Sequence, residues 1–315
     1  MAMRSNRQIV KAAGSTITTA GLAAGGALNP EQARRFIQQT FDATPLGPLV
    51  RHEMRVAKTG EIDKIGIARR ILRKKVENTD DGYRAGVTHG KIEYATTAVR
   101  VPWEITEETL RENIEGQNYE EVVTNLMTNQ IGCDAEDIYI NGDTAASVDD
   151  PDHDFLYVND GWLKQIKNGG HVVDVASKNS GAMSLDLFYD GLRAVPNKYN
   201  NGRLRWLMSP HRRQEWERYI LNQAVTVGGI ITDRRVENPA SIPAVEVPSM
   251  PDDAIILTDP QNLVVVNSYG VVIRKTTEGK DAIMQDKRFY VVHFDFDTII
   301  EELDATAVIT GLAAI

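Results

Sequence analysis

The sequence contains a single cysteine, Cys133, so an internal disulfide framework is excluded and a reducing compartment is expected. It has no apolar run of the roughly 18 to 20 residues that a membrane helix needs. The stretch from Ala12 to Leu28 consists mostly of Ala, Gly and Thr, which is too weakly apolar for a signal-peptide core. We therefore expect a globular protein with no membrane partner and with a flexible arm over residues 1–29.

Basic residues are nearly absent from residues 101–160, which carry Arg111 alone against 16 acids. Residues 1–100, in contrast, carry 17 Lys and Arg against 9 Asp and Glu. The net charge of −9 argues against general nucleic-acid affinity. Adjacent blocks of opposite sign favour recognition of a second copy of the chain, and so an assembly protein over a solitary enzyme.

Sequence motifs typical of catalytic or metal-binding sites are also scarce. The best metal candidate is an acidic loop, but, taken as a calcium loop from Asp150, it has Phe155 where a sharp turn needs Gly and Gly161 where the bidentate acid belongs. Ser209-Pro210-His211 is typical of a helix cap, and no G-x-S-x-G elbow is present. We expect no enzyme and no cofactor, and a metal-dependent hydrolase remains a minor alternative. The acidic loop comprises Asp149, Asp150, Asp152, His153 and Asp154.

A long projecting hairpin is predicted in the first third of the chain. Strand-like pieces at Ile62–Ile71 and Ile92–Trp103 flank a polar excursion of some 20 residues with a basic run. Such a hairpin has little core of its own, so another part of the assembly must support it. The alternative is that the basic run is a solvated loop. Its bases are Arg69, Arg70, Arg73, Lys74 and Lys75.

Two helices are predicted in the acidic block, after an earlier helix from Asn29 to about Phe41. Thr106 caps a short acidic helix, and a longer one runs from Asn118 to Asn141, about 36 Å long at 1.5 Å per residue. Apolar residues recur along it at three- and four-residue steps, and Gly142 follows as the C-terminal cap. Its predicted apolar stripe comprises Tyr119, Val122, Val123, Leu126, Met127, Ile131, Cys133, Ala135 and Ile138, which places Glu120 on the opposite face.

Mixed helices and strands follow a loop at Asp143–Gly161. Alternation from Phe289 to Asp297 predicts a half-buried strand, which resumes at Ala305–Ile309. The class is therefore α+β. Helices are predicted at Ser184–Val195 and Pro210–Leu221, and strands at Arg203–Met208, Gly229–Arg235, Ala254–Thr258, Leu263–Val266 and Val271–Arg274.

This order of elements resembles the major capsid proteins of tailed bacteriophages, which have the Hong Kong 97-type fold. The resemblance covers almost the whole chain and is carried by Val56–Val101, Pro102–Glu108, Asn118–Gly142, Arg203–Arg213 and Gly270–Thr310. It implies an N-terminal arm (1–54), a β-hairpin E-loop (55–103), a peripheral domain with a long spine helix (104–160), a mixed α/β axial domain (161–288), and return strands of the peripheral domain (289–315).

The resemblance further implies a virion shell built in the host cytoplasm from hexamers and pentamers around double-stranded DNA, with a separate scaffolding protein and a portal. The alternative within the fold is an encapsulin, a bacterial cage that holds an enzyme. The basic run is expected to contact the acidic block of a neighbouring subunit. The acids singled out there are Glu107, Glu108, Glu112, Glu115, Glu120 and Glu121.

Overall fold

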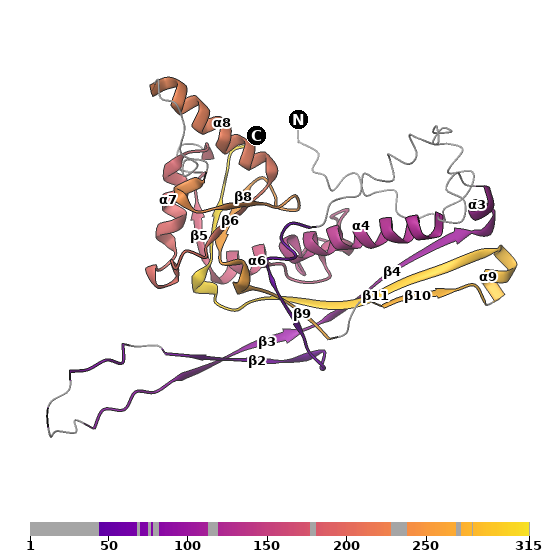
Figure 1. The fold of residues 1–315 in the computed structure, drawn as a ribbon, viewed down its shortest axis with the longest axis horizontal. Coiled ribbons are helices and arrows are strands. Elements are labelled where there is room, and N and C mark those ends of the chain that lie inside the picture. The colour runs from indigo at the N-terminus through magenta and orange to yellow at the C-terminus, as the bar shows by residue number, and fades with distance from the viewer. Residues whose placement is uncertain are drawn as a thin grey trace.

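The computed structural model describes residues 44–67, 70–74, 77, 82–112, 119–176, 181–227, 238–268, 272–278 and 280–314. These residues form two five-stranded sheets, each with its own helices, and a two-stranded hairpin that extends away from both (Figure 1). The predicted arm, the helix from Asn29 and the strand at Gly229–Arg235 lie outside the described residues. Within those residues, no helix is long and apolar enough to cross a membrane.

The first sheet is organised around β11 (Lys287–Ile300), the long strand predicted from the alternating aromatic residues. Its first part pairs antiparallel with β4 (Thr97–Thr106) and β10 (Val272–Thr276). Its last four residues pair with β9 (Leu263–Asn267), which also pairs in parallel with β1 (Arg51–Met54). The alternation of burial holds up to Phe294, and from Phe294 onward both faces of β11 are buried.

The long helix α4 (Tyr119–Asn141) lies along this sheet (Figure 1). It confirms the predicted spine helix, and Gly142 donates its N–H to Ile138 O at 2.9 Å where the helix ends. The short helix α3 (Glu107–Glu112) precedes it, with Thr106 Oγ1 accepting the Thr109 N–H as predicted. Helices α6 (Trp162–Gly169) and α9 (Lys280–Gln285), neither of them predicted, also contact β11.

The second sheet has the strand order β5-β12-β8-β6-β7 and a separate aromatic core. Helix α7 (Leu185–Ala194) begins at Ser184, whose hydroxyl accepts the Leu187 N–H, and it packs Phe188 against Trp206 and Trp216. Helix α8 (Pro210–Val227) starts where predicted. The strands are β5 (His171–Asp174), β6 (Arg205–Met208), β7 (Ala244–Glu246), β8 (Ala254–Thr258) and β12 (Ala307–Thr310).

Several sequence predictions need correction. The stretch Ile92–Trp103 is two strands, because the chain turns at Thr96 and changes its partner from β2 to β11. The expected loop 143–161 contains the short helix α5 (His153–Leu156). The expected return strands separate, because β12 joins the second sheet, whereas β9 and β10, expected in the 161–288 unit, pair with β11.

Candidate assembly interface

The projecting hairpin consists of β2 (Thr59–Gly66) and β3 (Thr88–Ala95), paired antiparallel from Thr59↔Ala95 to Gly66↔Thr88. Antiparallel partners share a face, so the hairpin has an inner face and an outer one. The inner face carries the apolar side chains that hold its root on the first sheet. Tyr94, Ile62 and Ile92 pack there against Val264, Val266 and Ile299.

Two carboxylates of β11 fix the corner where β3 turns into β4. Asp297 Oδ2 accepts the Ala95 N–H at 2.7 Å, and Asp295 Oδ2 accepts the Thr96 hydroxyl at 3.0 Å. Asp295 also accepts the N–H of Ser268 at 2.9 Å and is fully buried. Burial raises the pKa of Asp297, and the Ala95 N–H opposes that rise. The angle at which the hairpin leaves the sheet therefore depends on two buried acids.

A third attachment joins the middle of β2 to the connection between the two sheets. Lys64 Nζ donates to the Glu302 carboxylate and, at 3.2 Å, to the Glu301 carbonyl. Burial on its own would raise the pKa of Glu302, but the hydrogen bond from Lys64 outweighs it and the pKa is lowered. The hairpin root is thus fixed on both strands.

The predicted basic run lies at the far end of the hairpin, and Arg69 and Lys75 lie outside the described residues. Arg70, Arg73 and Lys74 are exposed. The Arg73 guanidinium lies 3.7 Å from the centre of the Tyr83 ring, and Arg84 donates to the Tyr83 carbonyl at 2.9 Å. The contact between Arg73 and Tyr83 therefore links the two sides of the hairpin in its outer part.

The acidic block was predicted to contact the basic run of a neighbouring subunit, but bases of β10 and β11 in the same chain already pair with part of it. Arg288 bonds both Glu107 and Glu120, and Lys275 also bonds Glu120. Glu120 is therefore part of an ion-pair network and does not lie on an exposed opposite face. Glu104 likewise pairs with Lys287 at 3.0 Å.

The pKa values of these acids follow from the pairing. The hydrogen bond from Arg288 lowers the pKa of Glu107 and raises that of Arg288 itself. Burial alone would raise the pKa of Glu120, but hydrogen bonds from Lys275 and Arg288 outweigh it and lower the value. Sequence reasoning missed these bases, because a strand 168 residues away leaves no local signal.

The other acids of the predicted set divide into three groups. Glu108 and Glu112 are exposed on α3. Glu115 lies outside the described residues, and for Glu121 only the backbone, within α4, is described. Of the members whose side chains are described, Glu108 and Glu112 are therefore the exposed ones.

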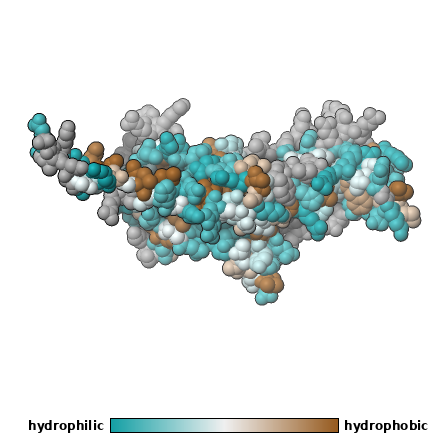
Figure 2. Space-filling model, turned by 90° about the horizontal axis from the view of Figure 1, so that it is seen from below, coloured by the Kyte–Doolittle hydropathy of each residue, from teal (hydrophilic) through white to brown (hydrophobic). Residues whose placement is uncertain are grey.

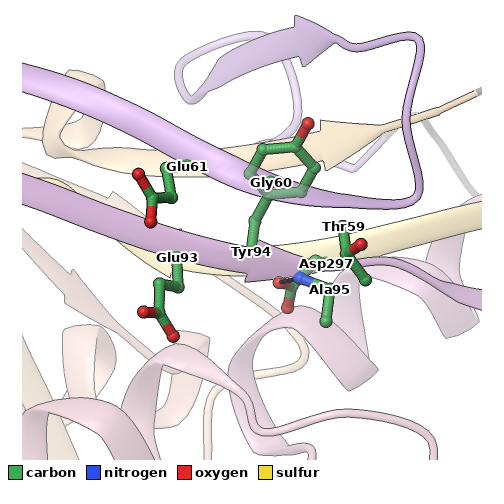
Figure 3. A pocket seen from close by; sticks show the side chains of 7 residues that line it. All are labelled: Thr59, Gly60, Glu61, Glu93, Tyr94, Ala95 and Asp297. Carbon is green, nitrogen blue, oxygen red and sulfur yellow. Dashed lines mark hydrogen bonds between the residues drawn. The ribbon is translucent and has the colours of Figure 1, made fainter.

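Sequence reasoning also missed an acidic pocket at the hairpin root. It is lined by the carboxylates of Glu61, Glu93 and Asp297 together with Thr59, Gly60, Tyr94 and Ala95. Figure 3 shows Glu61 and Glu93 side by side, on adjacent strands, with the Tyr94 ring directed to the other side of the hairpin. The alternation of β2 and β3 was the available signal, since it places position 61 opposite 93.

The candidate metal-binding and catalytic residues form local hydrogen bonds. In the acidic loop, Asp150 Oδ1 accepts the Asp152 N–H at 2.9 Å, and nowhere in the described ranges do three or more His, Cys, Asp or Glu gather to hold a metal. Asp252 accepts the Ser209 hydroxyl and lies 3.2 Å from His211 Nδ1. Ser209 and His211 both face the carboxylate and not each other, so a serine–histidine pair is not formed.

Solved structures match this arrangement over most of the chain. The capsid of an empty gene-transfer-agent (GTA) particle matches with a TM-score of 0.60 at 13% identity, covering 91% of this chain and 100% of that chain. A procapsid of satellite phage P4 that includes a size determination protein matches with 0.59 at 17% identity, covering 91% and 100%. The chain has the Hong Kong 97-type capsid fold.

The same fold also occurs outside phages. The holo-SrpI encapsulin complex of Synechococcus elongatus PCC 7942 matches with a TM-score of 0.58 at 13% identity, covering 91% of this chain and 96% of that chain. Among curated proteins, "Putative prophage capsid protein YqbE" of Bacillus subtilis (strain 168) is 27% identical over 324 residues, covering 96% of this chain and 97% of that protein. No protein-family model matches the sequence.

Proposed function

We propose that this chain is the major shell subunit of a phage-type capsid, which self-assembles into the hexamers and pentamers of an icosahedral head enclosing double-stranded DNA. The observation that carries the proposal is the hairpin. Its root is fixed by Asp295, Asp297 and Lys64, while its outer part extends away from both cores (Figure 1) with large apolar side chains exposed. A soluble monomer gains nothing from such an extension, whereas a shell subunit covers it with a neighbour.

The proposal includes a scaffolding protein on a separate chain, a portal, and assembly in the host cytoplasm before the subunit becomes part of the virion. The procapsid of satellite phage P4 supports the first of these, because it includes a second protein that determines size. We propose no catalytic step. Ser209 caps helix α8 by accepting the Arg212 N–H, and in the acidic loop the Asp150 carboxylate accepts the Asp152 N–H.

An encapsulin-type compartment is the second candidate, and the SrpI match favours it. The two candidates differ in content, since a phage head encloses DNA and an encapsulin encloses a protein cargo. A cage that protects a specific enzyme and no DNA would assign the chain to the second class.

Negative-stain microscopy and sedimentation of the purified full chain test the proposal. We expect closed shells, or rings of five and six subunits, in low salt. Co-expression with the neighbouring phage structural genes, followed by nuclease treatment, should leave protected DNA in the particles. A chain that stays monomeric in both settings, across concentration and salt, would contradict the proposal.

A further inference from the structure

The outer face of the hairpin shows a graded pattern of residue types along its length. The register that turns Tyr94 and Ile62 inward places three successive cross-strand pairs outward. From the root these pairs are Glu61↔Glu93, Asp63↔Lys91 and Ile65↔His89, and all six residues are exposed. The face is acidic where the hairpin joins the body and apolar further out.

The acidic root is short of positive charge. Glu61 and Glu93 are directly opposite each other, an arrangement of like charges that destabilises a strand pair. Lys91 bonds Glu61, and the charges of Asp63 and Glu93 further raise the pKa of Lys91. Three carboxylates thus share one ammonium on this face, with Asp297 at its edge (Figure 3). The root retains an excess of negative charge for a second basic group.

The middle of the hairpin is apolar and open to solvent. Ile65 is 67% exposed. Ile67 and Val87 lie just beyond the last strand pair, Gly66↔Thr88, and are 57% and 55% exposed. In Figure 2 brown atoms lie along the projecting arm on the left. Exposed apolar side chains grouped in this way mark an interaction surface.

The tip carries the opposite charge to the root. Arg70, Arg73, Lys74 and Arg84 are all exposed, and Arg73 is ordered by its contact with Tyr83. Along the chain, Arg73 stands as far beyond Ile67 as Glu61 stands before it. The pattern acidic–apolar–basic is therefore symmetric about Ile67 in its number of residues.

We propose that hairpins of two copies pack antiparallel on their outer faces, so that the basic tip of each lies on the acidic root of the other and the apolar middles meet near Ile67. A two-fold contact of this kind is isologous, and a pattern that is complementary to its own reverse satisfies it. The acids of the spine region are weaker acceptors, since Glu104, Glu107 and Glu120 already have basic partners in their own chain. The inference rests on the proposed self-assembly and identifies one surface that takes part in it, the contact that joins two subunits across a two-fold axis.

Charge reversal with rescue tests the pairing. The root variant Glu61→Lys/Glu93→Lys and the tip variant Arg70→Glu/Arg73→Glu/Lys74→Glu should each reduce the assembled fraction at least tenfold in sedimentation. The combined five-substitution variant exchanges the two charges in every copy and should assemble within about twofold of wild type. The matched control Glu108→Lys/Glu112→Lys, which reverses the exposed acids of α3, should assemble normally.

The outcomes distinguish a failure of the antiparallel pairing from a failure of the proposed function. Loss of assembly in the α3 control with normal assembly of the root variant would place the tip on the acidic block and overturn the antiparallel pairing. Absence of rescue in the combined variant, with its fold intact by circular dichroism, would also overturn it. If wild type itself never assembles, the proposed function fails instead.

Cross-linking tests the two-fold axis directly. On a Cys133→Ser background, Ile67→Cys should form a disulfide-linked dimer under mild oxidation, because the axis brings position 67 near its own copy. Val148→Cys, at an exposed loop position off the hairpin, should yield at least fivefold less dimer. Equal dimer yields for the two variants in assembled particles would overturn the isologous contact.

Discussion

The carboxylate of Asp297 accepts the backbone N–H of Ala95 at 2.7 Å, across 202 positions of sequence. The last residue of the hairpin is thereby bonded to the strand that organises the first sheet. Asp297 is mostly buried and close to the charge of Asp160, and both circumstances raise its pKa. The ionised form of Asp297 is therefore less stable in the folded protein than in the unfolded chain.

This cost predicts a pH-dependent effect of Asp297→Asn. The folded-state pKa of Asp297 is raised above the ordinary 3.8, so the free energy of unfolding of the wild type falls as pH rises from 3.8 through the folded-state pKa. An asparagine at this position does not titrate and causes no such fall. In urea unfolding, the stability of the variant relative to that of wild type should therefore increase between pH 3 and pH 7. Asp295→Asn is the comparison, since it turns an acceptor of Ser268 and Thr96 into a partial donor and should cost about 2 kcal/mol. A stability difference for Asp297→Asn that is the same at both pH values would contradict this.

Arg288→Gln should destabilise the protein at neutral pH by about 2 kcal/mol, because it removes charged hydrogen bonds to two carboxylates. The lowered pKa values of Glu107 and Glu120 set the sign of its pH dependence. Their contribution is present above the ordinary value of 4.5 and is lost as pH falls through the lowered folded values. Thermal unfolding of variant and wild type should thus converge toward pH 3. Arg111→Gln, whose 3.9 Å pair with Asp286 is well exposed, is the control and should change little.

Two apolar residues of the predicted stripe on α4 should respond differently to truncation. Ile138 is 5% exposed in the main core, so Ile138→Ala should cost about 2 to 5 kcal/mol. Leu126 is 37% exposed on the same helix, and Leu126→Ala should cost less than about 1 kcal/mol in the free subunit. Chemical unfolding of the unassembled subunit measures both. Equal costs would mean that Leu126 is covered in the free chain.

Arg212 should be essential for the C-terminal tail. Its side chain is 1% exposed and donates to the carbonyls of Asp252 and Ala313 and to Glu215. Arg212→Met leaves these acceptors without their donor and should cost about 3 kcal/mol. Carboxypeptidase should then release residues from the end of the chain faster, while the exposed Arg218→Met variant should behave like wild type. A slow release in both variants would show that other contacts hold the tail.

Local patterns predicted helices α3, α4, α7 and α8 and most of the strands, but not helices α5, α6 and α9. The successful predictions have a physical basis. The three- and four-residue steps of α4, the Ser184 cap of α7 and the alternation from Phe289 to Asp297 are all encoded within one element. Sheet partners are not encoded in this way. β12 follows β11 directly in the chain but joins the other sheet, and the alternation of Ala305–Ile309 contains no signal for that choice.

The charged segments of the candidate interface can likewise be predicted from the sequence, whereas the pairing of their residues cannot. The basic run and the acidic block are visible as charge counts, but a count does not reveal that Arg288 satisfies two of the acids. The root carboxylates were overlooked because Glu61 and Glu93 belong to the block counted as basic. Only the register of β2 with β3 places them opposite each other.

The strand β11 has a mechanical consequence. Its first ten residues pair with β4, its last four pair with β9, and the chain then continues through Glu302, which binds Lys64, into β12 of the second sheet. A pull on the hairpin therefore enters the body near the last residues of β11, where Asp295, Asp297 and Glu302 bind the hairpin. Such a force loads many β-ladder hydrogen bonds in shear together, and it does not peel them apart one by one. The subunit is built to transmit tension from its arm to both cores as a single stiff member.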